Sequence, residues 1–219
     1  MEFNIKLLFV ITSMVLNFNA AAKEKISLLA PYDEWYFNFF YPNSLPAEVT
    51  YVELLDTDGI YYQFRTLAST NASPGSVGQW SEKVSGMSSV FNKAKNPPMS
   101  IHFCWDSVID KKEYETWITL AGDVWKLMLT PYSPPGGGSE KYYLRYLLIG
   151  LAPEGKIGVW LEKPDKPNIR LTDKQILIET VSGEKMEMCN GRSAYKHGYS
   201  YPESTKNFIK DKKYPYGNW

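Results

Sequence analysis

The sequence predicts a mainly β fold, either an antiparallel β-sandwich or one strongly curved sheet, with a short helix near the C-terminus. Short segments rich in aromatic and β-branched residues recur between Gly, Pro, Asn and Asp, and this spacing predicts about eight or nine strands. Aromatic residues make up 15% of the chain, with 16 Tyr and 7 Trp, and such side chains pack well on pleated sheets. The clearest helix pattern comes late in the chain, and no internal repeat is visible.

The first 22 residues have the pattern of a cleavable secretory signal. Lys6 precedes an apolar run over 7–16, and the small residues 20–22 supply an A-x-A cleavage motif. As a helix this run would cover roughly 15 Å, about half of a bilayer's hydrocarbon core, so a permanent anchor is not expected. A buried N-terminal helix is the alternative interpretation. Residues 23–219 then form a single β-rich domain.

The positions of the cysteines and the balance of charged residues limit where the protein can reside and which classes of partner it can bind. The first cysteine is Cys104, too far along the chain for a lipid anchor, and no second apolar stretch of about twenty residues predicts a transmembrane segment. We therefore expect a monomer that is free in the periplasm or secreted. Lys and Arg number 24, as do Asp and Glu, and this neutral balance argues against nucleic-acid binding.

Two turns organise the expected strands. Residues 56–59, Asp-Thr-Asp-Gly, predict a tight hairpin, because the Asp-Gly pair accommodates positive φ angles. A calcium loop is the alternative, but its remaining ligands are absent. Residues 152–155 predict a second hairpin. The expected strands cover 35–41, 48–55, 60–66, 99–105, 114–120, 142–151, 156–161 and 175–181.

Irregular and helical segments lie between and after these strands. Residues 69–98 read as a long surface loop with Trp80, Met87 and Phe91 as anchors, and 133–139 as a flexible loop. A short helix is expected over 123–129, before Pro131. A second is expected over 203–212, after Pro202 and with lysines toward its C-terminal half.

A search for catalytic or metal-binding residues yields weak candidates. His102, Cys104 and Asp106 alternate along one expected strand, so the pleat alone places them on one face, and a zinc site would need further ligands. His197 lies in an irregular segment, exposed or in contact with a ligand. The adjacent acids Asp33 and Glu34 would point to opposite faces of a strand. We expect no catalytic, cofactor-binding or metal-binding residue, and no enzyme.

Cys104 and Cys189 are the only cysteines. An oxidising compartment permits them to pair, and closing so long a loop would stabilise the fold by roughly 4 kcal/mol. The sequence leaves open whether the two meet in space.

Three segments carry a resemblance to a known family. Residues 149–161, Ile-Gly-Leu-Ala-Pro-Glu-Gly-Lys-Ile-Gly-Val-Trp-Leu, form the strongest motif; residues 214–219, Tyr-Pro-Tyr-Gly-Asn-Trp, end the chain, and 100–105 form a strand with a tryptophan. Together they resemble bacterial exported proteins and lipoproteins catalogued as a domain of unknown function, often encoded beside type VI secretion lipase effectors. The motif residues, expected to be structural, are Gly150, Leu151, Pro153, Gly155, Val159, Trp160, Pro215, Tyr216, Gly217 and Trp219.

The resemblance implies an immunity protein that binds and neutralises a phospholipase effector, with a cognate lipase as its partner. We expect the contacts on 69–98, 131–141 and 192–201, because these segments are irregular. The alternative is an envelope protein that binds a carbohydrate or another small ligand, suggested by the Tyr and Trp content, or an envelope protein with a structural role.

Overall fold

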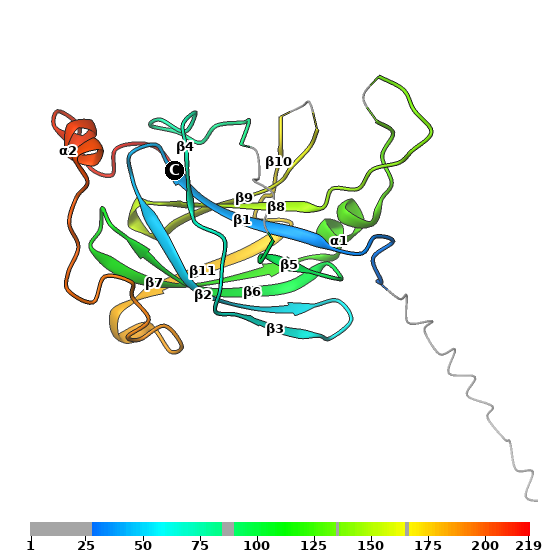
Figure 1. Cartoon of the computed structure of the whole chain (residues 1–219), viewed down its shortest axis with the longest axis horizontal. Coiled ribbons are helices and arrows are strands. Elements are labelled where there is room, and N and C mark those ends of the chain that lie inside the picture. The colour runs from blue at the N-terminus through cyan, green and yellow to red at the C-terminus, as the bar shows by residue number, and fades with distance from the viewer. Residues whose placement is uncertain (1–27, 85–89, 135, 165–166) are drawn as a thin grey trace, which may run out of the picture.

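The computed structural model forms two β-sheets that face each other across a shared core (Figure 1). It describes residues 28–84, 90–134, 136–164 and 167–219. The predicted signal peptide, residues 1–22, and the expected anchor Met87 lie outside these ranges.

Sheet A is mixed. In spatial order it contains β10 (Ile169–Arg170), β9 (Lys156–Leu161), β8 (Tyr146–Ala152), β1 (Trp35–Pro42) and β4 (Asn71–Ser73), and β5 (Lys93–Ala94) also pairs with β1. Strand β1 is parallel to both β4 and β8, whereas β8 and β9 form an antiparallel hairpin. The parallel pairs arise because the chain leaves sheet A after β1 and returns only after long connections.

Sheet B is antiparallel throughout. Its order is β11 (Ile176–Ser182), β7 (Lys112–Leu120), β6 (Pro98–Ser107), β2 (Ala47–Asp56) and β3 (Tyr61–Phe64). The connection from β2 to β3 is the expected tight turn, with Gly59 at φ +83°. The buried Asp56 carboxylate accepts the N–H groups of Asp58 and Ile60, both at 2.9 Å, so this aspartate serves the turn.

The core lies between the sheets. Ile101, Phe103 and Trp105 of β6 point into it and are fully buried, as their alternation predicts. The Phe103 ring meets Phe39 of β1 across the core at 5.0 Å between centroids. Burial of side chains of this size contributes about 1.5–3 kcal/mol each, so the two sheets stabilise each other.

Two short helices complete the fold. Helix α1 (Gly122–Leu129) follows β7, and α2 (Glu203–Ile209) lies near the C-terminus and docks through a 2.8 Å hydrogen bond from Thr205 Oγ1 to the Ser44 carbonyl. The prediction of a mainly β fold with a C-terminal helix is confirmed, with antiparallel pairing complete in sheet B and partial in sheet A. No helix among the described residues is long and apolar enough to cross a membrane.

The described residues of 69–98 form more regular structure than the expected surface loop. It contributes β4 and β5 to sheet A, and Trp80 is buried against that sheet. Phe91, expected to be an anchor, is instead 52% exposed. The sequence contains isolated aromatic residues in a polar stretch here, and their local pattern does not indicate which of them packs against a sheet.

Candidate functional site

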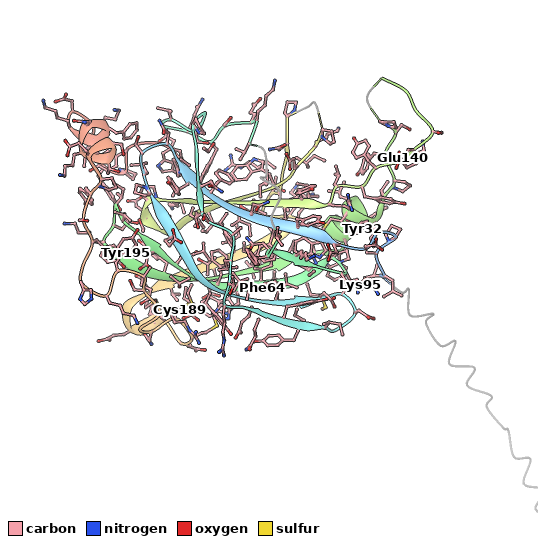
Figure 2. All side chains as sticks on the ribbon, viewed as in Figure 1. Tyr32, Phe64, Lys95, Glu140, Cys189 and Tyr195 are labelled. Atoms are coloured by element: carbon pink, nitrogen blue, oxygen red, sulfur yellow. A yellow bond between two sulfur atoms is a disulfide. The ribbon has the colours of Figure 1, made fainter. Side chains whose placement is uncertain are left out.

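A cavity of about 1060 Å³ opens at the end of sheet A where β8 begins. We call it the tyrosine groove, after Tyr32, Tyr142, Tyr143 and Tyr146, which line it together with Arg145. Figure 2 shows Tyr32 at this end of the molecule, with Glu140 above it on the projecting loop that follows α1. The groove therefore lies between the start of sheet A and an exposed loop.

Strand pairing positions one wall of the groove. Tyr146 is the first residue of β8, and its register partner on β1 is Tyr36. The two rings are stacked, with centroids 5.1 Å apart and planes 15° from parallel. The Tyr36 N–H donates to the Arg145 carbonyl at 2.7 Å, which fixes the backbone just before β8.

A second tyrosine pair closes the base of the projecting loop. Tyr132 and Tyr142 exchange both backbone hydrogen bonds, at 2.8 and 3.0 Å, and their rings stack at 5.6 Å. This bridge begins and ends the segment 133–141, whose residues 138–141 line the groove. The loop is thus held at its base while its tip projects.

Tyr32 and Arg145 supply the polar character of the groove. The Tyr32 ring meets Tyr143 at 5.4 Å, and the Arg145 guanidinium lies 5.9 Å from the Tyr32 ring centroid. Burial raises the pKa of the Tyr32 hydroxyl, and the charge of Arg145 opposes part of that rise. Within the described part of the chain, the Tyr32 hydroxyl has no hydrogen-bond partner, and the Arg145 guanidinium has neither a hydrogen bond nor an ion pair.

The groove offers binding groups. Tyrosine rings provide flat apolar faces, their hydroxyls both donate and accept, and Arg145 carries five N–H donors. Two carboxylates, Glu140 and Glu162, also border the cavity. No group of three or more His, Cys, Asp and Glu side chains suited to a metal ion occurs in the described ranges.

These tyrosines were not identified as a site from the sequence. The segment 142–151 was expected to be one strand, but β8 begins only at Tyr146. Tyr142, Tyr143 and Arg145 precede the strand and line the groove, whereas Leu144 between them is buried in the core. The run Tyr-Tyr-Leu-Arg-Tyr at 142–146 was the available signal, but Tyr32 joins it from more than a hundred residues earlier.

His102 does not belong to the groove. It lies on the outer face of sheet B, stacked on Trp117 at 4.3 Å, with Nε2 2.7 Å from a carboxylate oxygen of Glu115. His197, the other histidine, is exposed in an irregular segment. The structure does not bring the two histidines into the tyrosine groove.

Residues 183–201, a segment that we call the strap, lie on the outer face of sheet B. Glu115 holds the part of the strap at residues 187–189. Its fully buried carboxylate accepts N–H groups of Glu187, Met188 and Cys189 at 2.8–3.2 Å. Burial by itself would raise the pKa of Glu115, but these donors and His102 outweigh it and lower the pKa. A disulfide joins Cys104 of β6 to Cys189, with Cα atoms 5.3 Å apart, and attaches the strap covalently.

Asp106 holds the next part of the strap. Its buried carboxylate accepts the Ser193 hydroxyl at 2.7 Å, the Ala194 N–H at 2.8 Å and the Tyr199 hydroxyl at 2.6 Å. The expected binding segment 192–201 is therefore partly committed to intramolecular contacts. Figure 2 shows Tyr195 at the end of the molecule opposite Tyr32.

The central and C-terminal motifs meet on the outer face of sheet A, whereas the third segment, 100–105, belongs to β6 of sheet B. Trp160 of β9 and the C-terminal Trp219 both pack against Trp80, at 5.3 and 5.2 Å. With Phe40 they form what we call the tryptophan cluster. The Asn218 N–H donates to the Gly78 carbonyl at 2.8 Å, so the C-terminus is attached to this face.

The remaining motif residues shape the hairpin between β8 and β9 and the final turn. Pro153 and Gly155 lie in the turn that connects β8 to β9, where Gly155 has a φ of +71°. Leu151 and Val159, on the two strands of this hairpin, are buried in the core. Pro215, Tyr216 and Gly217 lead into Trp219, and the Trp219 indole N–H donates to the Pro215 carbonyl at 3.1 Å. The motif residues described here take part in packing and turns.

Comparison with protein families identifies the chain. Residues 19–217 match the family described as "Protein of unknown function (DUF2931)", and the chain belongs to this family. No curated protein and no solved structure matches it.

Proposed function

We propose that this member of the DUF2931 family is an exported, non-catalytic binding protein whose ligand occupies the tyrosine groove. The observation that carries the proposal is the composition of the groove: partly exposed tyrosine rings beside an arginine that forms no ion pair with any described residue. Sites that recognise ligands combine aromatic surface with a few directed polar groups, and Tyr and Arg are enriched where binding energy concentrates.

The disulfide supports an extracytoplasmic location, because such bonds persist in oxidising compartments. We propose the periplasm, after removal of residues 1–22, and a monomeric state. Cell fractionation, intact mass of the mature protein and sedimentation analysis test these three statements. A full-length mass, or a cytosolic protein with reduced Cys104 and Cys189, would contradict export.

One candidate partner is a phospholipase effector, which would make the chain an immunity protein. Residues 136–141 favour a protein partner, since they are exposed on the loop that projects beside the groove (Figure 1). The test mixes the mature protein with the lipase encoded beside its gene and measures complex formation and lipase activity. Tyr143→Ala should weaken both, while Lys174→Ala, on an exposed turn before β11, should leave both unchanged.

A carbohydrate or other small ligand is the second candidate. The stacked Tyr36–Tyr146 and Tyr132–Tyr142 pairs favour it, because they hold tyrosine rings at the groove in fixed orientations. Pre-positioned rings reduce the ordering cost of binding a flat ligand. Titration of glycans into the mature protein, followed by tyrosine fluorescence and calorimetry, separates this candidate from the lipase.

A further inference from the structure

We infer that the tyrosine groove binds a saccharide that carries a single carboxylate. This inference rests on the proposed function and names the chemistry of its ligand. It follows from the rings, from two polar groups that have no partner among the described residues, and from the charges around the groove.

The rings call for a ligand with flat, weakly polar faces. Tyr32, Tyr142, Tyr143 and Tyr146 are all partly exposed where they line the groove. A pyranose ring presents C–H groups on its faces and hydroxyls around its edge, which suits an aromatic surface bordered by phenol groups. The volume of about 1060 Å³ lies at the upper end of small-ligand pockets, so the groove has space for more than one sugar ring.

The Tyr32 hydroxyl calls for a hydrogen-bonding ligand. Its oxygen is buried and lacks a partner among the described residues, a state that costs about 1–3 kcal/mol. A phenol both donates and accepts, as a sugar hydroxyl does. Because the oxygen itself is buried, a saccharide hydroxyl can satisfy it only if the Tyr32 side chain turns toward the groove on binding; a purely apolar ligand could not satisfy it in any position.

Arg145 calls for one anionic group. Its guanidinium is held near the Tyr32 ring and presents a planar set of donors that matches a carboxylate in two-point contact. Lys141 also lines the groove, with Nζ 2.7 Å from the Ser133 hydroxyl. The carboxylate of Glu140 borders the same cavity and would repel a ligand with many negative charges.

The test uses matched pairs of disaccharides with the mature protein. One pair is N-acetylglucosaminyl-N-acetylmuramic acid and chitobiose; the other is cellobiouronic acid and cellobiose. Within each pair the sugar rings correspond. The muramic acid carries its carboxylate on an added lactyl ether, and cellobiouronic acid has a carboxylate in place of one hydroxymethyl group. Calorimetry should show that at least one acid binds about tenfold or more tightly than its neutral partner, with a preference that weakens as salt rises.

Two variants assign the contacts. Arg145→Gln should remove the preference for the acid, and Tyr143→Ala should weaken the acid and its neutral partner alike. Arg170→Gln is the matched control, because Arg170 lies 5.5 Å from the Trp160 ring in a similar stacked arrangement but does not line the tyrosine groove. Unchanged thermal unfolding midpoints establish that each variant is folded.

Three outcomes would overturn the inference. Equal affinity within both pairs would exclude recognition of the carboxylate. An affinity for the tripeptide acetyl-Gly-Glu-Gly-amide equal to that for the acidic disaccharides would assign the groove to acidic peptides. If neither acid binds, the inference about the saccharide is wrong. A lipase complex that Tyr143→Ala disrupts would in that case still support the proposed binding function of the groove. A lipase complex that Tyr143→Ala leaves unchanged, or the absence of any lipase complex, would show that the groove binds neither kind of ligand.

Discussion

Asp106 and Glu115 are buried carboxylates on the neighbouring strands β6 and β7, and both accept hydrogen bonds from the strap. A buried carboxylate is unfavourable unless donors surround it. Each acid here accepts hydrogen bonds from at least three strap residues. These residues therefore stabilise the fold, although in the sequence His102, Cys104 and Asp106 resembled the beginnings of a reactive cluster.

Replacement of Glu115 tests its role as an anchor. We expect Glu115→Ala to lower the free energy of unfolding by about 3 kcal/mol, because three backbone N–H groups would lose a charged acceptor. Urea denaturation at pH 7 measures this, with Glu179→Ala on the exposed face of β11 as the control. A loss equal to that of the control would show that the strap docks without this carboxylate.

The same residue predicts a dependence on acid. Since the fold lowers the pKa of Glu115, its contribution is present above the unfolded-state pKa of about 4.3 and is lost as the pH falls through the lower folded-state value. The wild type should therefore lose stability below about pH 4 more steeply than Glu115→Gln. Parallel slopes for the two proteins in urea titrations across this range would contradict the assignment.

Glu48 presents the opposite case. Its register partner on β6 is Asp106, and Asp106 is also paired with Glu113 on β7, so three acids lie side by side. Burial first, and then the charge of Asp106, raises the pKa of both Glu48 and Glu113. A raised folded-state pKa means that the charged form opposes folding at neutral pH.

We accordingly expect Glu48→Gln to stabilise the protein at pH 7 by about 0.5–1 kcal/mol, the size of a like-charge pair across strands. The gain should disappear on acidification, because the wild-type carboxyl becomes protonated as the pH falls through its raised pKa. Thermal unfolding of both proteins at pH 7 and pH 4 measures the difference. A gain that persists unchanged at pH 4 would point to packing instead of charge.

At the scale of elements, the tryptophan cluster joins four parts of the chain: β1, the segment after β4, β9 and the C-terminus. The glycine of the central motif makes this possible. A Cβ atom on Gly150 would lie 2.6 Å from the Trp80 ring and 2.8 Å from the Phe40 ring. Gly150 thus lets Trp80 approach the backbone of β8, which gives the motif a packing explanation.

Gly150→Ala should therefore destabilise the protein by about 1–3 kcal/mol, as added volume does in a closely packed site. Gly122→Ala is the control, because the nearest atom to its added Cβ is 4.0 Å away on Trp125. Urea denaturation compares the two variants, and tryptophan emission, to which the three tryptophans of the cluster contribute, gives a second signal. If Gly150→Ala is as stable as the control, Trp80 has room to move and the packing explanation is wrong.

For the whole molecule, local patterns predicted the elements better than their partners. Strand positions and the Asp-Gly turn follow from alternation and turn chemistry, which depend on neighbours along the chain. The parallel pairing of β1 with β8 joins segments about a hundred residues apart, and no local pattern records it. The tyrosine groove was missed for the same reason, since Tyr32 meets Tyr143 and Arg145 only in the folded chain.

The disulfide between Cys104 of β6 and Cys189 joins the strap covalently to sheet B. It connects residues 85 positions apart, and on the chain-entropy model its removal should cost about 4–5 kcal/mol. We expect the double variant Cys104→Ala/Cys189→Ala to remain folded, because Asp106 and Glu115 still hold the strap, but to unfold at lower urea concentration.

Hydrogen exchange of this double variant should show faster exchange first at the amides of residues 187–189, which donate hydrogen bonds to Glu115, and later in β6 and β7. Equal acceleration in all three would mean that the strap and sheet B open as one unit. A loss of stability below ~1 kcal/mol would mean that the carboxylate anchors, and not the covalent bond, determine how firmly the strap is attached.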